Sequence, residues 1–320
     1  MNETGKNLDV MCLGIFVADA LAKPITKIPD WRHLELIEQV ELHTGGCANN
    51  TGTGLAKLGL RVGAEGKVGT DGFGDFILKH LTSNNIDVRG MVRDDKVNTS
   101  FTFVMIAPDG ERAFFHFVGA NGAYGIEDVN FDLIGESKIL HVAGSFVMPK
   151  LDGEPTAAVL KRSQEMGVIT CLDTVWNGAI DAYTTLKPSL PYLDYFLPSI
   201  DEARLMTGQD TPADVAQFFL DHGVGTIGLK MGAEGSYLAN KGAAVHVPAF
   251  KVNVIDTSGA GDSWIAGFLA GITLGWHLEQ SGRLGSAMGA MCATAIGTTA
   301  GLRGMNETIE FMNKAEILEI

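Results

Sequence analysis

The feature that most constrains the fold is an alternation of short β-rich runs with longer amphipathic runs along much of the chain. Runs typical of buried strands occupy residues 8–16, 61–69, 138–144, 168–174 and 226–230. Runs typical of helices occupy residues 49–60, 75–85, 154–167 and 211–223. Strands that alternate with helices in this way usually lie parallel in one sheet. The sequence therefore predicts an α/β protein with a doubly wound, mostly parallel sheet and helices on both faces.

Two stretches, 15–44 and 96–119, interrupt the alternation. The first contains two prolines and no clear helical period, and the second alternates like a pair of strands around a turn at 108–110. We expect the two stretches to form a small antiparallel sheet that acts as a lid or as an oligomer interface. The α/β core then consists of residues 1–14, 45–95 and 120–320.

The charge balance limits the partners of the chain, because 24 Lys and Arg residues face 38 Asp and Glu residues for a formal net charge of −14. Nucleic acids and anionic membranes need a positive surface, so neither is an expected partner. No apolar run reaches the ~20 residues that span a bilayer, and no signal peptide is expected. The cysteines show no paired spacing, so we expect reduced thiols and a cytoplasmic protein. They are Cys12, Cys47, Cys171 and Cys292.

The segment 254–271, VIDTSGAGDSWIAGFLAG, places a glycine-rich turn between a β-branched run and an amphipathic helix. Backbone amides at such a helix N-terminus form an anion site. A bound phosphate would repel Asp262 in the first helical turn, unless this carboxylate accepts the proton of an attacking alcohol, as phosphoryl transfer from ATP requires. From these residues alone, an ordinary first-turn Asp that favours the helix dipole is an equal alternative.

A wider set of motifs resembles the ribokinase-like (pfkB) carbohydrate kinases. Residues 256–262, DTSGAGD, are similar to the family signature DTxGAGD, and residues 45–59, GGCANNTGTGLAKLG, are similar to its GGxxxN signature. The resemblance continues through 66–74, 197–208 and 229–235 in the order typical of the family. It implies a ribokinase-like fold and transfer of the γ-phosphoryl of ATP to a primary hydroxyl of a sugar or sugar acid. It also implies Mg²⁺ with ATP. The apolar strands of the lid separately suggest a homodimer formed through the lid.

The resemblance assigns roles around the glycine-rich turn and the sugar. Asp262 would be the catalytic base, and the amides of Gly259, Ala260 and Gly261 would form the anion hole. Asp256 would organise the loop beside a site for a monovalent cation such as K⁺. The positions that correspond to sugar contacts are Asp19, Gly45, Gly46 and Asn50.

These sugar-side positions have structural alternatives. The Asp19 carboxylate can accept hydrogen bonds from two sugar hydroxyls, although it can also be a solvated turn residue. Asn50 can equally be a helix N-cap, and Gly45-Gly46 can be a plain turn.

The resemblance also assigns a nucleotide side. Lys230, Gly232 and Gly235 correspond to the nucleotide loop, and the same residues also suit a β-hairpin turn. Ser199 stands where many relatives have Asn, so the sequence leaves undecided whether Ser199 contacts the nucleotide or only caps a helix. Glu202 would reach Mg²⁺ through water, yet Ser-x-x-Glu is also a capping box. Ala290 stands where relatives often have Asn or His, so adenine is expected to meet apolar groups and backbone.

Several alternatives stay open from the sequence. The acceptor can be ribose, fructose, a keto-deoxy sugar acid or a nucleoside, and Arg112 can meet a substrate carboxylate or be a solvated lid charge. Gly52-Thr53-Gly54 before a helix suggests a dinucleotide-dependent oxidoreductase, but the third glycine of that motif is missing. A catalytically silent sugar-binding regulator is the third class, and the presence of Asp262 argues against it. The lid side chains expected to form the dimer surface are Phe101, Phe103, Phe114 and Phe115.

Overall fold

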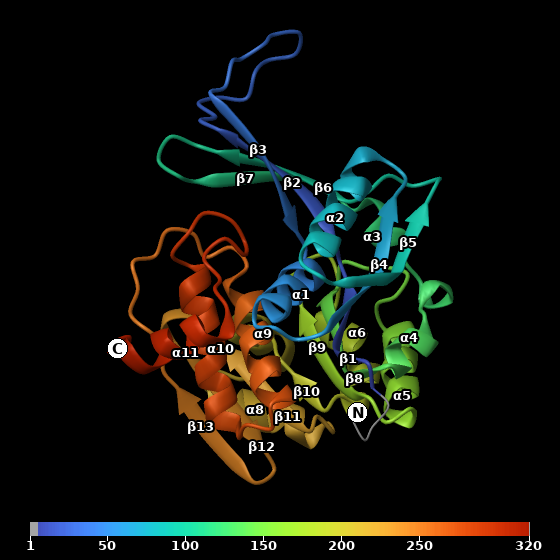
Figure 1. Cartoon of the computed structure of the whole chain (residues 1–320), viewed down its shortest axis with the longest axis vertical. Helices are drawn as coiled ribbons and strands as arrows, with labels where there is room; N and C mark the ends of the chain where they lie inside the picture. The colour runs from blue at the N-terminus through green and yellow to red at the C-terminus, as the bar shows by residue number, and fades with distance from the viewer. Residues whose placement is uncertain (1–5, 320) are drawn as a thin grey trace.

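The computed structural model describes residues 6–319 and contains a large sheet flanked by helices, with a small sheet projecting at one end (Figure 1). The strands of the large sheet are β1 (Leu8–Gly14), β4 (Val62–Gly69), β5 (Asp87–Asp94), β8 (Ser137–Ser145), β9 (Ile169–Thr174), β10 (Tyr195–Phe196), β11 (Thr226–Lys230), β12 (Ser236–Asn240) and β13 (Ala243–Val247). Their order is β13-β12-β11-β10-β9-β8-β1-β4-β5. Neighbouring strands from β11 to β5 are parallel, and β12 and β13 add an antiparallel hairpin at one edge. The predicted mostly parallel sheet is confirmed.

Helices cover both faces of this sheet because strand side chains alternate between two buried apolar clusters. In β1, Val10 and Cys12 join one cluster, whereas Met11 and Leu13 join the other. The first face is covered by α1 (Cys47–Lys57), α2 (Gly72–Ser83), α9 (Ala260–Thr273), α10 (Leu278–Cys292) and α11 (Met305–Lys314). The second face is covered by α4 (Phe131–Gly135), α5 (Glu154–Glu165), α6 (Ala182–Leu186), α7 (Ile200–Thr207) and α8 (Pro212–Asp221). The arrangement confirms the expected helices on both faces.

The helices α10 and α11 were not anticipated from the sequence. The sequence of α10, LEQSGRLGSAMGAMC, is rich in small residues, and its apolar stripe of Leu284, Met288 and Met291 is short. Its helical state depends on close packing against α9, where a Cβ on Gly267 would lie 2.5 Å from the carbonyl oxygen of Leu284. Tertiary packing rather than intrinsic propensity therefore determines this element.

The small sheet is built from the two segments that break the α/β alternation. Its strands are β2 (Val17–Lys23), β3 (Gln39–Gly45), β6 (Phe101–Ile106) and β7 (Arg112–Phe117), in the order β3-β2-β6-β7. Two antiparallel hairpins, β2-β3 and β6-β7, meet at a parallel pairing of β2 with β6. Residues 24–38 connect β2 to β3 at the outer end of this sheet, where Trp31 is 96% exposed.

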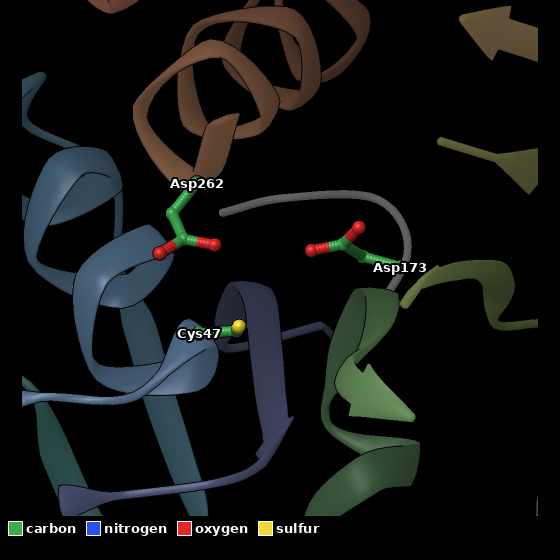
Figure 2. A group of neighbouring side chains, drawn as sticks. All are labelled: Cys47, Asp173 and Asp262. Carbon is green, nitrogen blue, oxygen red and sulfur yellow. The ribbon is translucent and has the colours of Figure 1, made fainter. Parts of the chain in front are cut away.

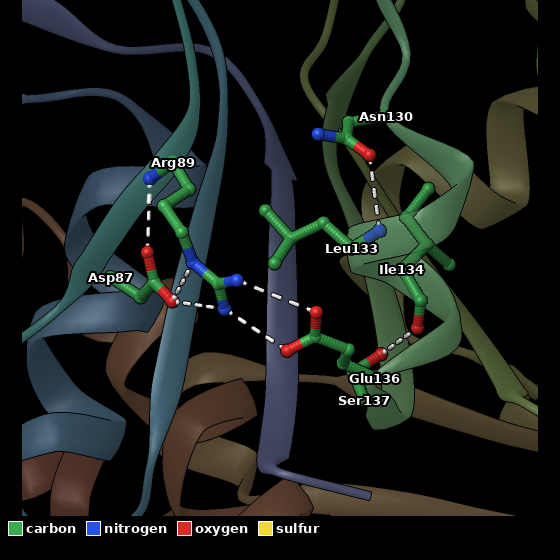
Figure 3. A network of polar contacts seen from close by, with 7 residues as sticks. All are labelled: Asp87, Arg89, Asn130, Leu133, Ile134, Glu136 and Ser137. Atoms are coloured by element: carbon green, nitrogen blue, oxygen red, sulfur yellow. Dashed lines mark hydrogen bonds and ion pairs between the residues drawn. The ribbon is translucent and has the colours of Figure 1, made fainter.

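A polar network ties the edge strand β5 to the segment that precedes β8 (Figure 3). The Arg89 guanidinium lies 2.7 Å from the Asp87 carboxylate and 3.0 Å from the Glu136 carboxylate. Asn130 caps α4 by accepting a 3.1 Å hydrogen bond from the amide of Leu133. The helix α3 (Gly119–Ala123) lies between β7 and this network. These contacts fix the path by which the chain returns from the small sheet to the core.

The cysteines are free thiols, and Cys12, Cys171 and Cys292 are buried. None of the helices between residues 6 and 319 combines the length and the apolar character that crossing a membrane would require.

Candidate active site

The glycine-rich turn lies at the N-terminus of α9, as the sequence predicts. Gly259 caps the helix with φ 75°, and a Cβ there would lie 2.5 Å from the carbonyl oxygen of Thr298, so only glycine fits. The Ala260 amide donates to the carbonyl of Thr257 at 3.1 Å and is used within the turn. Among residues 6–319, no acceptor is found for the amides of Gly259 and Gly261, and both residues line a cavity. The turn therefore offers two of the three expected amides to an anion.

Asp262 follows in the first turn of α9 and points toward the same cavity. The Asn50 side-chain amide donates a 2.8 Å hydrogen bond to the Asp262 carboxylate, and the Thr51 hydroxyl donates to the Asp262 carbonyl at 3.3 Å. Burial raises the pKa of Asp262, whereas the Asn50 hydrogen bond and the charge of Lys230 oppose this rise. Asn50 is not the N-cap of α1, because Gly46 occupies that position. The structure thus brings two predicted site residues together.

Asp173 and Cys47 join Asp262 in one group, which the sequence analysis missed (Figure 2). Figure 2 shows Asp262 at the start of α9, Cys47 at the start of α1 and Asp173 at the end of β9 pointing into a common space. One ligand atom from each lies within 4.8 Å of those of the other two. Lys230 donates to the Asp173 carboxylate at 3.0 Å. The available signal for Asp173 was its position at the carboxyl end of a buried parallel strand, where α/β proteins bind ligands.

The ionisation of this group follows from its burial. Burial raises the pKa of Asp173, and the ammonium of Lys230 opposes that rise. The pKa of Lys230 is raised, since the attraction of Asp173 and of the nearby carboxylates outweighs the desolvation of the ammonium. Burial and the neighbouring carboxylates raise the pKa of the Cys47 thiol, which therefore stays protonated. We find no basis for a nucleophilic role of Cys47.

Ser199 and Glu202 form the capping box that was one of their two interpretations. The Ser199 amide donates to the Glu202 carboxylate at 3.0 Å, and the Glu202 amide donates to the Ser199 hydroxyl at 3.3 Å. Thr174 at the end of β9 also donates to Glu202, at 2.9 Å. These residues line a cavity of about 490 Å³ together with Asp173 and Lys230. Carboxylate and hydroxyl oxygens are suitable ligands for Mg²⁺.

A second, mainly apolar cavity of about 330 Å³ adjoins the first and shares Lys230, Gly232 and Gly261 with it. Its walls include Gly235, Ala249, Phe250, Val252, Val254, Trp264, Gly289, Ala290 and Ala293. The strands β11 and β12 form the antiparallel hairpin that was the structural interpretation of the KMGAEG segment. Ala290 contributes a methyl group to the apolar wall of this second cavity.

The small sheet presents a row of polar residues across its four strands. Asp19 pairs with His43 on one side and with Thr102 on the other, and Thr102 pairs with His116. Paired residues on neighbouring strands share a face, and a 3.1 Å hydrogen bond joins Thr102 and His116. Burial raises the pKa of Asp19, against the hydrogen bond from Thr102 and the charge of His43.

Gly45 and Gly46 connect this row to α1. A Cβ on Gly45 would lie 2.0 Å from Oδ2 of Asp19, so the bare backbone makes room for that carboxylate. Gly46 has φ 92° and caps α1, and a Cβ there would lie 2.4 Å from the carbonyl oxygen of Ile15. Asp19, Gly45 and Gly46 thus meet at the junction of the two sheets, next to the helix that carries Asn50.

Asp256 and Arg112 form an ion pair that neither interpretation of Arg112 anticipated. The Arg112 guanidinium donates to Oδ1 of Asp256 at 3.0 Å and to the Ser258 hydroxyl at 2.8 Å. The amides of Ser258 and Gly297 donate to the same carboxylate at 2.9 Å and 3.0 Å. Burial favours a higher pKa for Asp256, but the Arg112 and amide hydrogen bonds lower it to about 2. Arg112 is therefore not a fully solvated charge, and its Nη1 group is bound to Asp256 and Ser258.

Gly52 and Gly54 lie inside α1 rather than in a turn before it. A Cβ on Gly54 would lie 2.8 Å from the side chain of Ala266, so this glycine permits close packing of α1 on α9. A dinucleotide-binding loop needs its glycines between the strand and the helix. The position of these glycines contradicts the oxidoreductase interpretation.

Comparisons with known proteins show the family to which this chain belongs. The family model for pfkB family carbohydrate kinases matches residues 7–303. A 2-dehydro-3-deoxygluconokinase of Bacillus subtilis is 28% identical over 280 residues, covering 84% of this chain and 86% of that protein. A ribokinase of Staphylococcus aureus is 28% identical over 242 residues, covering 74% and 77%.

Solved structures give the same fold. A putative ribokinase II from E. coli, crystallised in complex with ATP and Mg²⁺, superimposes with a TM-score of 0.84 at 22% identity and covers 96% of this chain and 99% of its own. The expected ribokinase-like fold is confirmed. With the family model matched over almost the whole length, the chain belongs to the pfkB family of carbohydrate kinases.

Proposed function

We propose that this pfkB family member transfers the γ-phosphoryl group of ATP to a primary hydroxyl of a neutral sugar, with Asp262 as the general base. The observation that carries the proposal is the position of Asp262 beside the free amides of Gly259 and Gly261. A base and an anion site within one helical turn can receive the proton of the alcohol and the charge of the transferred group together. The raised pKa of Asp262 strengthens it as a proton acceptor.

The two adjoining cavities suit a nucleotide. The apolar walls around Ala290 and Phe250 would receive adenine, and the cavity beside Lys230 would receive the phosphates. Glu202 and Asp173 would hold Mg²⁺, directly or through water, with Thr174 nearby. The ion supplies neutralisation of the phosphate charge, which an acidic chain with a net charge of −14 needs. Ser199 would act through the orientation of Glu202 rather than through the nucleotide.

We further propose that residues 15–44 and 96–119 form a lid over the sugar. Asp19 would accept hydrogen bonds from two hydroxyls, and His43, Thr102 and His116 would contact others from the same face. Closure of this lid would exclude water and suppress hydrolysis of ATP.

Charge favours a neutral acceptor over a sugar acid. On this side of the site, Arg112 is held by Asp256 and Lys230 by Asp173. A substrate carboxylate would meet the Asp19 and Asp262 carboxylates, while Arg112 and Lys230 are each already paired with a carboxylate, so repulsion would oppose its binding. A sugar phosphate would be disfavoured for the same reason.

The finer aspects of the biology are also proposals. The exposed apolar side chains of the small sheet and its outer loop, among them Trp31, Leu36, Phe114 and Phe115, would form a homodimer surface. The free, mostly buried thiols suit a reducing compartment such as the cytoplasm. K⁺ at Asp256 fits poorly, because the carboxylate already pairs with Arg112.

The direct test is a panel of neutral sugars, sugar acids, sugar phosphates and nucleosides with Mg-ATP, in which ADP release is measured and the product is identified by mass spectrometry. We expect a neutral sugar to give the highest kcat/KM, and excess EDTA to abolish turnover. A panel in which no acceptor stimulates ADP release would contradict the kinase proposal. A sugar acid as the best substrate would contradict the neutral acceptor alone.

A further inference from the structure

The ion pair between Arg112 and Asp256 joins two parts of the chain that are 144 residues apart. Arg112 is the first residue of β7 in the lid, whereas Asp256 begins the turn that leads into Gly259 and Gly261. The Asp256 side chain is 3% exposed and that of Arg112 is 25% exposed, so the pair is largely shielded from solvent. Such a pair is weakly screened by salt, and removal of the Arg112 side chain would leave the buried Asp256 carboxylate without its cation.

Asp256 organises the anion turn through several contacts at once. Its Oδ1 accepts hydrogen bonds from the Ser258 amide and from Arg112, and its Oδ2 accepts one from the Gly297 amide. Thr298 follows Gly297, and the Gly259 backbone packs closely on it, because a Cβ on Gly259 would lie 2.5 Å from the Thr298 carbonyl oxygen. Asp256 therefore positions both backbone segments that shape the anion site, the turn at Ser258 and the loop at Gly297.

The lid contacts this region at a second point. The Thr298 hydroxyl donates to the carbonyl of Thr44 in β3 at 3.3 Å. The neighbouring Gly297 packs near His43, since a Cβ on Gly297 would lie 3.4 Å from Nδ1 of that imidazole. Contacts from both β3 and β7 mean that the lid cannot leave the core without disturbing the loop that supports the anion site.

A monovalent cation does not fit this arrangement. K⁺ would need Asp256 as its charged ligand, but Oδ1 of that carboxylate already accepts hydrogen bonds from the Arg112 guanidinium and the Ser258 amide, and Oδ2 accepts one from the Gly297 amide. A second cation beside Arg112 would be repelled by it. The guanidinium itself supplies a fixed positive charge at this position.

We propose that Arg112 is a positioning residue that takes the place of a monovalent cation. From the lid it holds Asp256, and through Asp256 it holds the turn that presents Gly259 and Gly261 to the transferred phosphoryl group. Phosphoryl transfer in this protein then depends on lid closure and is independent of K⁺. This inference rests on the proposed kinase function.

The test compares initial rates at saturating Mg-ATP and sugar in a buffer whose monovalent cation is tetramethylammonium, with and without added K⁺. The wild type is expected to show the same kcat in both media. Arg112→Ala should lower kcat by roughly 10- to 100-fold, because a misplaced anion site loses transition-state contacts. Added K⁺ or guanidinium should restore part of this loss. The kcat of Arg112→Lys should lie between those of the wild type and Arg112→Ala. In Arg112→Ala/Asp256→Ala the rescue should disappear.

Lys27→Ala is the matched control, since Lys27 is a lid cation paired with Glu35 at 2.6 Å in an exposed position. It should match the wild type in both media, and melting temperatures should show that each variant is folded. If Arg112→Ala fails to fold, Arg112→Lys provides the test instead. Added K⁺ should raise the kcat of this variant, because Lys would replace the monovalent cation less well than Arg does.

Three results would overturn the inference. They are a wild type that requires K⁺, an Arg112→Ala variant with unchanged kcat, and a loss confined to the KM for sugar, which would place Arg112 in the sugar site. A protein without sugar-dependent ADP release in either medium would contradict the kinase function instead.

Discussion

The Asn50 side-chain amide donates a 2.8 Å hydrogen bond to the Asp262 carboxylate, although the two residues are 212 positions apart. Asn50 lies in the first turns of α1 and Asp262 in the first turn of α9, so the bond also joins the N-termini of two packed helices. It fixes one oxygen of the carboxylate, and in the proposed mechanism the other oxygen would receive the proton of a substrate hydroxyl. The orientation of this proposed base would then be set by the packing of the helices before a substrate arrives.

The first prediction concerns Asp262→Asn, which keeps the size of the side chain and removes its ability to accept a proton. We expect kcat to fall by roughly 10²–10⁴-fold, the usual contribution of a positioned base. ATP affinity should be retained, because the anion site is made of backbone amides. The measurements are single-turnover rates and nucleotide titration of the same preparation. A variant with the wild-type kcat would show that Asp262 only favours the helix dipole.

The second prediction uses Gly45→Ala to displace Asp19 without changing any polar group. The added Cβ would lie 2.0 Å from Oδ2 of Asp19 and must push the carboxylate aside. We expect kcat/KM for sugar to fall by a factor equivalent to about 2–4 kcal/mol of transition-state stabilisation, as for Asp19→Ala. The KM for ATP should be unchanged. Gly72→Ala is the control, because a Cβ there meets no atom within 4 Å. Equal sugar kinetics in both variants would remove Asp19 from the acceptor site.

The third prediction tests the apolar nucleotide cavity with Ala290→Phe. The ring would occupy space in a cavity of about 330 Å³, so the KM for ATP should rise roughly 10- to 100-fold, with little change in the KM for sugar. Gln280→Phe, at an exposed position on the same helix, should leave both constants near those of the wild type. If adenine binds elsewhere, the two variants will have the same KM for ATP.

The fourth prediction concerns Glu65, a fully buried carboxyl in β4 that accepts hydrogen bonds from the Tyr124 hydroxyl and the Asn130 amide. Burial raises its pKa to about 7. A raised carboxyl pKa means that the folded state holds the proton more tightly than the unfolded state. The contribution of Glu65 to the free energy of unfolding is therefore greatest below its unfolded pKa and decreases as the pH rises from that pKa toward 7, by about 3 kcal/mol at most.

The Glu65→Gln variant cannot titrate at this position, so its melting temperature should fall less than that of the wild type between pH 5 and pH 8. Thermal denaturation at the two pH values measures the difference. Glu127→Gln, which removes an exposed carboxylate nearby, should retain the wild-type pH dependence. Parallel curves for the wild type and Glu65→Gln would mean that Glu65 stays ionised in the folded protein.

The fifth prediction concerns assembly. Trp31 and Leu36 are 96% and 89% exposed in the outer loop of the small sheet. If this loop belongs to a dimer interface, Trp31→Glu should shift the protein from dimer to monomer in sedimentation experiments, because an unpaired carboxylate would be desolvated there. Val254→Glu, an exposed apolar position outside the small sheet, should not. A wild type that is monomeric at all concentrations would contradict the proposed interface.

Sequence patterns predicted the parts of this protein that depend on local chemistry. The turn before Asp262, the two segments of the small sheet and the strands β1, β4, β8, β9 and β11 each carry their signal within a few residues. The parallel strands β5 and β10 were not predicted. The capping box of Ser199 and Glu202 is equally local. Each of these features follows from backbone propensity and side-chain spacing, so a single sequence contains the necessary information.

The parts that escaped prediction depend on which distant segments meet. Lys230 and Asp173 are 57 residues apart, and Arg112 and Asp256 are 144 residues apart. No periodicity links such pairs, because their contact follows from strand order and from how the lid lies on the core. The helix α10 escaped for a related reason, since its small residues gain their helical state only by packing on α9.

The small sheet has a consequence for how such a chain can change over time. The pairing of β2 with β3 runs from Val17 opposite Gly45 to Lys23 opposite Gln39, and this register fixes Asp19 and Gly45 next to each other. Residues 24–38 lie beyond the last pair, so insertions or deletions there leave the inner register intact. Under the proposed roles, variation in loop length would alter how copies of the chain assemble and would preserve the acceptor site. Assembly and chemistry would then be able to diverge independently within one continuous hairpin.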